Sequence, residues 1–401
     1  MRHASRIALL AALVGIGLLL PHLVSDFRLV QFATVGIYFI AILGLDFLTG
    51  YSGQISLGHG AFMAIGGYTS AILIVHHGWN DLATIPVAGL VAGLAGLLFG
   101  IPALRLSGLY LALVTFALAV SMPSIIKKWE TQTGGSSGLL VNVFHTNRWY
   151  YTVTWITAGI LFVLGWLLLQ TKFSRAWRAI RDSELAAASM GINLALYKTA
   201  AFGVSALYAG VAGALLVILS FGANPGSFPI QLSVYLVVGL AVSGLGGSLW
   251  GLLVGAAFVE YVQVWAPELS KSPGVPTLVF GVVLVVVMFL LPGGAAALPA
   301  RLEDLWKNGL AKSGVTLVCA LALVYGVAGS ARVDPGVSPG RRAALRARPT
   351  AYADAGAGAR RASRGGTLTI SRRRSGRSAT TSTVISTPSH CDQRSCAPKA
   401  T

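Results

Sequence analysis

Apolar residues in the first three quarters of this chain gather in long runs, which short stretches of glycine, polar and charged residues separate. A helix needs about 20 apolar residues to cross the hydrocarbon core of a bilayer. The runs therefore predict an all-α, polytopic membrane protein with about ten transmembrane helices. They cover roughly residues 6–24, 29–48, 55–75, 82–100, 107–126, 150–170, 199–221, 232–246, 249–265 and 275–292.

Two parts of this pattern are ambiguous. Arg2 and Arg6 before an apolar run also suit a secretory signal, but no small-x-small cleavage site follows Leu20. We therefore expect an uncleaved first helix. The eighth and ninth runs are short, and only residues 246–248 separate them. They fit either one long kinked helix or a tight hairpin of two helices.

The basic residues orient the predicted helices, because cytoplasmic loops carry an excess of Lys and Arg. With the N-terminus inside and ten spans, Arg105, the basic loop 171–198 and the basic residues within 301–312 also fall inside. The basic residues within 127–148 count against this scheme, but they flank a long outer loop. We therefore expect both termini in the cytoplasm.

Composition divides the chain into two parts. Charged residues make up 11% of it and the mean hydropathy is +0.72, which excludes a soluble globular domain. Residues 1–312 contain 16 Lys and Arg against 10 Asp and Glu, whereas residues 313–401 contain 14 against 3. Cys319, Cys391 and Cys396 all lie in the second part, so the first has no disulfide and no thiolate site.

A glycine-rich segment, residues 50–68, interrupts the apolar pattern with the sequence GYSGQISLGHGAFMAIGGY. Gly60, Ala64, Gly67 and Ala71 follow helical spacing and share one face. Small residues on one face let two helices approach closely. We expect this helix to pack tightly against another helix or to line a narrow passage.

The start of this segment is a candidate translocation path. Its glycines can break the helix and expose backbone N–H groups toward a cavity, where they suit a substrate carboxylate. Asp46, His59 and Glu260 also enter apolar runs, where ionisable groups are functional hypotheses. Asp46 and Glu260 can instead reach an interface, and His59 also fits a structural hydrogen bond. The path candidates are Gly50, Tyr51, Gly53, Gln54, Ser56, Gly58 and His59.

The basic loop 171–198 contains a short helix-like stretch. Asp182 or Ser183 can accept the free N–H groups of a first turn. The alanines that follow are strong helix formers, and Gly191 suits the left-handed residue that ends a helix. About eight helical residues are roughly 12 Å long, too short to cross a membrane. Taken alone, this stretch also fits an ordinary basic inner loop.

Residues 50–68 resemble the pattern GYxGQxSLGHxxFxxxGAY of the permease subunits of branched-chain amino-acid ABC transporters, which are ATP-driven importers. TGGSSGL at 133–139 resembles an outer loop of that family, and the resemblance covers roughly residues 1–312. The inner loop resembles the family's E-x-A-A-x-x-x-G coupling helix, which docks on the ATP-binding subunit. The resemblance thus implies an ATPase-coupling loop made of Arg181, Asp182, Glu184, Ala186, Ala187 and Gly191.

The resemblance also implies a transport system in the bacterial inner membrane. Its other parts would be a second permease subunit, two cytoplasmic ATP-binding subunits and a periplasmic substrate-binding protein. Leucine, isoleucine and valine are the expected cargo, with urea, short amides or other amino acids as alternatives. No catalytic residue, cofactor or metal is expected. The sequence has no G-x-x-x-x-G-K-[ST] phosphate loop, so another polypeptide would bind the ATP.

Other classes of protein fit less well. A self-sufficient secondary transporter usually has buried acid–base pairs for ion coupling, and residues 1–312 offer almost none. The G-x-S-x-G match at 134–138 lies in a loop, whereas a nucleophile elbow needs a strand before it and a helix after it. The Arg-rich end lacks the interleaved aromatic residues of a nucleic-acid binder, so no nucleic acid is expected.

The end of the chain changes character after the transmembrane permease domain, which we expect to be residues 1–312. Residues 313–336 resemble a signal peptide, with an apolar run that follows basic residues and ends in small ones. Residues 337–401 are rich in Arg, Ser and Thr and are predicted to be a disordered basic tail. We interpret both as a neighbouring reading frame joined to the permease. A genuine tail that binds anionic lipid is the alternative.

Overall fold

The computed structural model describes residues 25–104, 106, 108–141, 145–246, 249–269 and 281. The predicted first span, at 6–24, lies outside the described residues, and so does the tenth, at 275–292, apart from Gly281. The predicted C-terminal segments 313–336 and 337–401 also lie outside them.

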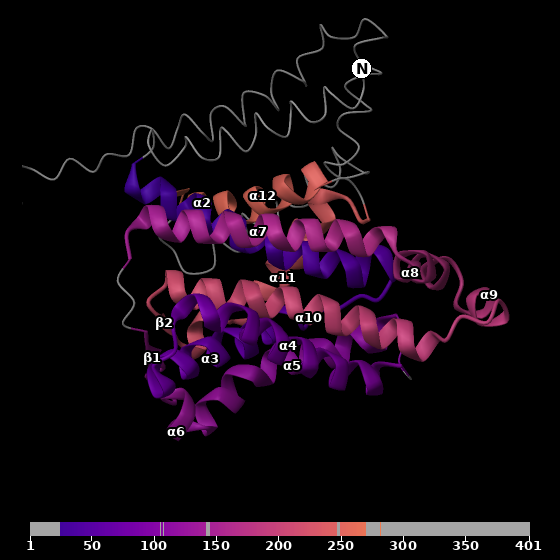
Figure 1. The fold of residues 1–401 in the computed structure, drawn as a ribbon, viewed down its shortest axis with the longest axis horizontal. Coiled ribbons are helices and arrows are strands. Elements are labelled where there is room, and N and C mark those ends of the chain that lie inside the picture. Colours follow the sequence, from indigo (N-terminus) through magenta and orange to yellow (C-terminus); the bar gives the residue numbers. More distant parts are fainter. Residues whose placement is uncertain are drawn as a thin grey trace, which may run out of the picture. The chain divides into compact units, whose positions relative to one another are not determined.

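The described part of the chain is almost entirely helical, as the apolar runs predict (Figure 1). In chain order its elements are α2 (Asp26–Leu45), the π-helix η1 (Asp46–Tyr51), α3 (His59–His77), α4 (Asp81–Ala103), α5 (Leu109–Lys128), α6 (Glu130–Thr133), β1 (Leu139–Leu140), α7 (Asn147–Gln170), α8 (Lys172–Asp182), α9 (Glu184–Ser189), α10 (Leu194–Leu219), β2 (Gly222–Ala223), the 3₁₀ turn η2 (Pro225–Ser227), α11 (Ile230–Ser243) and α12 (Leu249–Leu269).

Six of the described helical segments are long and apolar enough to cross a membrane. They are Asp26–Tyr51, Asp81–Ala103, Leu109–Lys128, Asn147–Gln170, Leu194–Leu219 and Pro225–Ser243. The predicted third span forms α3, a helix of 19 residues, and α12 contains a shorter apolar stretch, Gly251–Val264. An all-α, polytopic membrane protein is thus confirmed.

The eighth and ninth apolar runs form a hairpin. α11 ends at Ser243, and Gly244 and Gly246, with φ of 91° and 64°, turn the chain toward α12. The two helices touch at Gly239 and Gly255, where a Cβ on Gly255 would overlap the carbonyl oxygen of Gly239. The hairpin is therefore the right alternative, and one long kinked helix is wrong.

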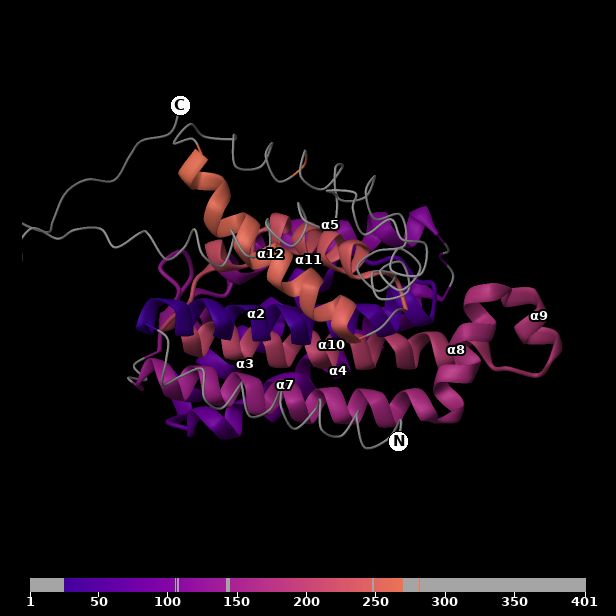
Figure 2. The same cartoon turned by 90° about the horizontal axis from the view of Figure 1, so that it is seen from above.

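α10 is the central helix, because it packs against α2, α3 and α4 (Figure 2). A Cβ on Gly66 of α3 would overlap the backbone of Gly210, and one on Gly96 of α4 would overlap Cβ of Ala206. Such close approach supplies dispersion contacts between helices, which apolar area alone does not provide in lipid. The small face of α3 takes part in this packing, since Gly67 lies against Val217 of α10.

The helix ends fall into two groups (Figures 1 and 2). α8 and α9 extend beyond one end of the helices, whereas α6, β1 and β2 lie at the opposite end. β1 and β2 pair antiparallel, with Leu139 opposite Ala223 and Leu140 opposite Gly222. The basic loop 171–198 and the loop that holds α6 and β1 thus lie at opposite ends, as the distribution of charges predicts.

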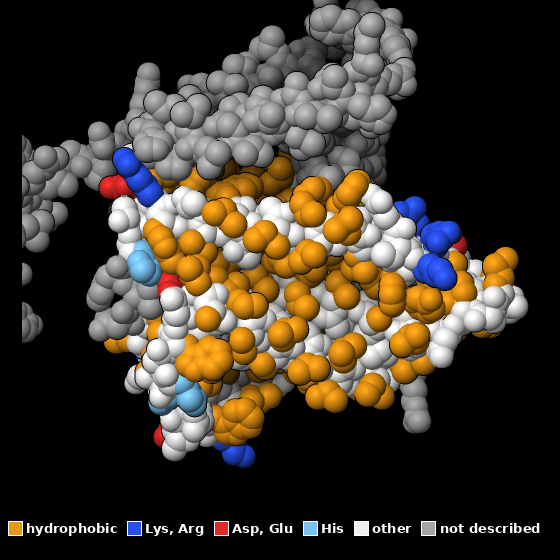
Figure 3. Space-filling model, viewed as in Figure 1, with side chains coloured by type: hydrophobic (Ala, Val, Ile, Leu, Met, Phe, Trp, Pro, Cys, Tyr) orange, Lys and Arg blue, Asp and Glu red, His pale blue; other side chains and the backbone are white. Residues whose placement is uncertain are grey.

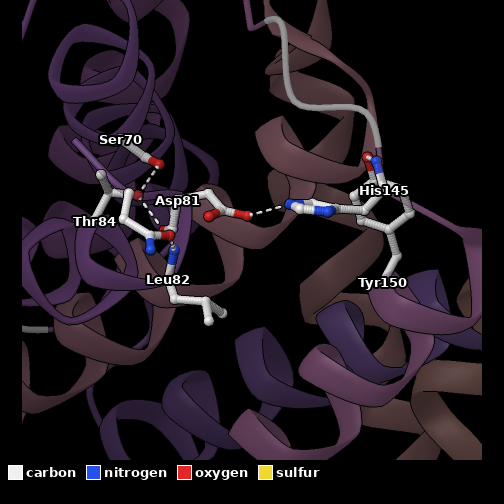
Figure 4. A network of polar contacts seen from close by, with 7 residues as sticks. Ser70, Asp81, Leu82, Thr84, His145 and Tyr150 are labelled. Atoms are coloured by element: carbon white, nitrogen blue, oxygen red, sulfur yellow. Dashed lines mark hydrogen bonds and ion pairs between the residues drawn. The ribbon is translucent and has the colours of Figure 1, made fainter. Parts of the chain in front are cut away.

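A polar network ties three elements together at the α6 end (Figure 4). The ring of His145 lies 3.0 Å from the carboxylate of Asp81, the first residue of α4. Thr84 donates to the carbonyl of Asp81 at 2.7 Å, and its hydroxyl lies 2.7 Å from that of Ser70 on α3. The network therefore joins the starts of α4 and α7 to the last turns of α3.

The outer surface over α4, α7 and α10 is apolar (Figure 3). Leu94 and Leu98 of α4 are 61% and 68% exposed, and Leu167 of α7 is 49% exposed. An apolar surface of this extent is typical of contact with lipid. Lys and Arg side chains gather at one edge of it, at the α8 end of the helices (Figure 3).

Candidate coupling and translocation site

The glycine-rich segment forms a break between two helices. α2 runs into the π-helix η1, the backbone is then non-helical from 52 to 58, and α3 begins at His59. We call residues 52–58 the helix break. Gly50 in η1 has no room for a side chain, because a Cβ there would overlap the carboxylate of Asp46. π-Helical turns occur frequently at functional sites.

Side chains from other helices satisfy the backbone at the end of the break. Thr115 of α5 accepts a hydrogen bond from the N–H of Leu57 at 3.0 Å. Ser233 of α11 accepts one from the N–H of Gly60 at 2.9 Å. Ser52, Gln54, Ser56 and Gly58 of the break are buried in protein, the setting in which irregular backbone is tolerated inside a membrane, whereas Gly53 and Ile55 are exposed.

His59 is fully buried at the first turn of α3. Its Nε2 lies 2.9 Å from the carbonyl oxygen of Ala41, which requires Nε2 to carry the proton and donate. Nδ1 then carries a lone pair, and it has no hydrogen-bond partner within the described ranges. His59 thus makes a structural hydrogen bond to α2 and keeps one acceptor available.

The path candidates fall into two groups. Gln54, Ser56, Gly58 and His59 are buried among the helices. Gly50, Tyr51 and Gly53 instead contact α8. Arg181 donates from Nη1 to the carbonyl oxygen of Gly50, and the guanidinium of Arg178 lies 5.4 Å from the ring centre of Tyr51.

Two further contacts join the segment around η1 to α8 and to the turn between α11 and α12. Gly53, with φ of 73°, lies so close to α8 that a Cβ on it would be 3.1 Å from Cγ of Arg181. The N–H of Gly246, in the turn between α11 and α12, donates to the buried carboxylate of Asp46 at 2.8 Å. Asp46 therefore does not extend into solvent but anchors this turn to η1.

α8 is an amphipathic helix. Thr171 caps its start by accepting from the N–H of Phe173 at 3.2 Å. Trp177 and Ile180 are buried on one side, and Nε1 of Trp177 donates to the carbonyl of Tyr197 at 2.9 Å. Its basic residues lie on the exposed side, so α8 has the character of a helix at a membrane interface.

α9 is the short helix that the sequence predicts. Of the two candidate caps, Ser183 accepts from the N–H of Ala186, at 3.3 Å. Gly191 has φ of 79°, the left-handed conformation expected at the end of this stretch. Leu185 and Met190 are 86% and 81% exposed, so α9 presents an apolar surface beyond the helices.

An ion pair joins α9 to the central helix. Nζ of Lys198, in α10, lies 2.7 Å from a carboxylate oxygen of Glu184. Lys198 is 5% exposed, whereas the Glu184 side chain is about half exposed. The sequence did not predict Lys198 as the partner of Glu184, nor Gly246 as the partner of Asp46. The usable signal for Lys198 is its place near the start of an apolar helix, where an unpaired buried lysine is costly.

Residues 29–291 match the family described as the branched-chain amino acid transport system permease component. The chain is 31% identical over 336 residues to the High-affinity branched-chain amino acid transport system permease protein LivM of Escherichia coli (strain K12). The alignment covers 76% of this chain and 77% of that protein, and the same values hold for LivM of Salmonella typhimurium. The Autoinducer 2 import system permease protein LsrC of Klebsiella pneumoniae is 27% identical over 118 residues, 27% of this chain and 33% of LsrC. No solved structure matches the chain.

The fold and the comparisons together define a multi-pass inner-membrane permease subunit of an ABC transporter. The chain belongs to the branched-chain amino acid transport system permease family.

Proposed function

We propose that this chain translocates leucine, isoleucine and valine across the bacterial inner membrane as one subunit of an ATP-driven importer. Its family and the names of its two LivM relatives support this cargo. The similarity to LsrC spans only a third of that protein and does not favour another substrate. ATP hydrolysis belongs to other subunits in this proposal, because the chain has no phosphate loop of its own.

The loop from Arg181 to Gly191 is the proposed coupling loop. Its exposed apolar residues Leu185 and Met190 offer a surface to a cytoplasmic ATP-binding subunit. The ion pair between Glu184 and Lys198 holds α9 against α10. A displacement of α9 would therefore be transmitted to the central helix α10 through this ion pair.

The observation that carries the proposal is the contact between α8 and η1. Arg181 bonds to Gly50 and Arg178 lies against Tyr51, so α8, the helix directly before the coupling-helix motif of residues 184–191, touches the start of the glycine-rich segment. Movement of α8 would then change the helix break and the buried residues Gln54, Ser56, Gly58 and His59. We assign translocation to this break. Nδ1 of His59 is fully buried and unpartnered, so movement of the break would have to expose it before it could accept a hydrogen bond from a substrate ammonium group.

The proposed assembly contains a second permease subunit, two ATP-binding subunits and a periplasmic substrate-binding protein. The coupling loop requires that α8 and α9 lie in the cytoplasm, and the ten-span scheme then puts both termini on that side. The permease domain is residues 1–312 in this proposal, and residues 313–336 and 337–401 take no part in transport.

Uptake of labelled leucine tests the cargo. Cells without their own branched-chain amino acid uptake, expressing the full chain with the partner subunits of its system, should import leucine. An excess of unlabelled isoleucine or valine should compete, and urea should not. Competition by urea or a short amide, with none by isoleucine, would show that the assigned cargo is wrong.

A further inference from the structure

Glu260 is buried near the middle of α12. This helix runs from Leu249 to Leu269, so eleven of its residues precede Glu260 and nine follow it. At about 1.5 Å per residue the nearer end is roughly 14 Å away, close to half of a hydrocarbon core of about 30 Å. The residue is 8% exposed, because α12 packs against α2 and α11 (Figure 2). Glu260 therefore lies away from both ends of the helix and from the interfaces there.

The carboxylate of Glu260 has no partner within the described ranges. It forms neither an ion pair nor a hydrogen bond with any residue there. The groups that face it are phenols: Tyr38 of α2 and Tyr261 of α12 lie within electrostatic range of its charge. Tyr235 of α11 lies in turn within electrostatic range of Tyr38. Arg28, near the start of α2, acts on Tyr261 but forms no ion pair with Glu260. The described part of the chain thus leaves this carboxylate without a counter-charge.

A carboxylate inside a membrane must be neutralised by a proton or a cation, because an unpaired charge there is costly. The phenols around Glu260 favour a cation. The faces of aromatic rings attract ammonium groups, and carboxylate and hydroxyl oxygens accept their hydrogen bonds. An amino-acid cargo carries an ammonium group of this kind. It is also a cation that transport itself would bring into the membrane.

Glu260 and the end of the helix break contact the same part of α2. His59, the first residue of α3, bonds to the carbonyl oxygen of Ala41. Glu260 faces Tyr38, which is three residues earlier on α2, less than one turn of the helix. The unpartnered carboxylate and the break to which translocation is assigned thus lie at a similar level along α2.

We propose that the carboxylate of Glu260 binds the ammonium group of the amino acid as the cargo crosses the middle of the membrane. The phenol of Tyr38 lies beside this site and contributes to it. The inference rests on the proposed function, since it needs an amino-acid cargo. It adds to the path a charged group that lies outside the glycine-rich segment.

Leucine uptake by Glu260→Gln tests the role of the charge, because glutamine has the shape of the protonated carboxyl group but cannot ionise. The variant is assembled in vesicles with the partner subunits of its system. We expect uptake to fall about tenfold or more, the usual weight of a hydrogen bond to a charged group. Thermal stability should not fall, because an uncompensated buried charge is removed. Glu130→Gln, which changes an exposed carboxylate of α6, is the matched control and should transport normally.

Labelling of the wild type tests the occupant directly. Dicyclohexylcarbodiimide is an apolar reagent that modifies carboxyl groups buried in membranes, and mass spectrometry of the peptide that contains Glu260 measures the reaction. The complete transporter is labelled during ATP hydrolysis, with its binding protein, in the presence and absence of leucine. Leucine should slow the modification of Glu260 severalfold, and urea should not.

Three results would overturn the proposal and leave the proposed function standing. Uptake by Glu260→Gln equal to that of Glu130→Gln would show that a proton neutralises Glu260. Loss of the second permease subunit from the purified Glu260→Gln complex would show that a cation of that subunit pairs with Glu260. Modification at the same rate with and without leucine would show that the cargo does not reach Glu260. A wild type that imports no amino acid would instead overturn the proposed function and this inference with it.

Discussion

Arg181 of α8 donates a hydrogen bond to the backbone carbonyl of Gly50, which lies 131 positions earlier in the chain. Gly50 belongs to the π-helix η1 that follows α2, and Gly246 lies against both Gly50 and the guanidinium of Arg181. The N–H of Gly246 in turn bonds to Asp46. One arginine thus connects α8 with the end of α2 and with the turn between α11 and α12.

Gly191→Val should abolish leucine uptake without preventing membrane insertion. The φ of 79° at this position is strained for a β-branched residue, at a cost of about 1–3 kcal/mol. A Cβ there meets no atom within 4 Å, so the effect comes from the backbone and stays local to α9. Uptake and the amount of protein in the membrane are measured together. Gly159→Val, on α7, also meets no atom and should transport normally. Normal uptake by Gly191→Val would contradict the role of α9.

Glu184→Gln should destabilise the chain, because it leaves the buried Lys198 without its counter-charge. Glu184 is about half exposed, so we expect a loss of about 1 kcal/mol in the free energy of unfolding. Thermal unfolding in detergent measures it. The charge-reversed double variant Glu184→Lys/Lys198→Glu should recover part of the loss relative to Glu184→Lys. No recovery would mean that the ion pair does not join α9 to α10.

Gly66→Ala should lower stability by about 1–3 kcal/mol, the usual cost of overpacking. Its Cβ would meet the backbone of Gly210, which cannot rotate away as a side chain can. Thermal unfolding of the full chain, with Gly159→Ala as control, measures the effect. Equal stability of the two variants would show that α3 and α10 do not pack as closely as described.

The sequence predicts the helices and the local features of the site, but it does not predict the contacts between distant segments. Helical apolar runs, the cap at Ser183 and the left-handed Gly191 depend on local rules, and all three appear in the structure. The contact between Arg181 and Gly50 depends on how distant helices pack, which no local pattern encodes. For the same reason the sequence places Tyr51 among the path candidates, although its ring lies against Arg178 of α8.

Truncation after Lys312 should leave insertion, assembly and leucine uptake intact. The elements that form the coupling and translocation site, η1, α8, α9 and the turn between α11 and α12, all precede this residue. Residues 337–401 are too poor in apolar residues to build a core. The comparison is between the truncated and the full-length chain at equal expression. An unstable or inactive truncated chain beside an active full-length one would show that the C-terminal part belongs to the transporter.

The most direct test of the coupling proposal is leucine uptake by Arg181→Met in vesicles that contain the full chain and the partner subunits of its system. A hydrogen bond from a charged donor contributes about 1.5–3 kcal/mol, so we expect uptake to fall about tenfold or more. Assembly and basal ATP hydrolysis should persist, because α9 and its surface are unchanged. Arg148→Met, an exposed arginine at the opposite end of the helices, is the matched control and should transport normally. Uptake by Arg181→Met equal to that of the control would contradict the account that α8 drives the helix break through Gly50.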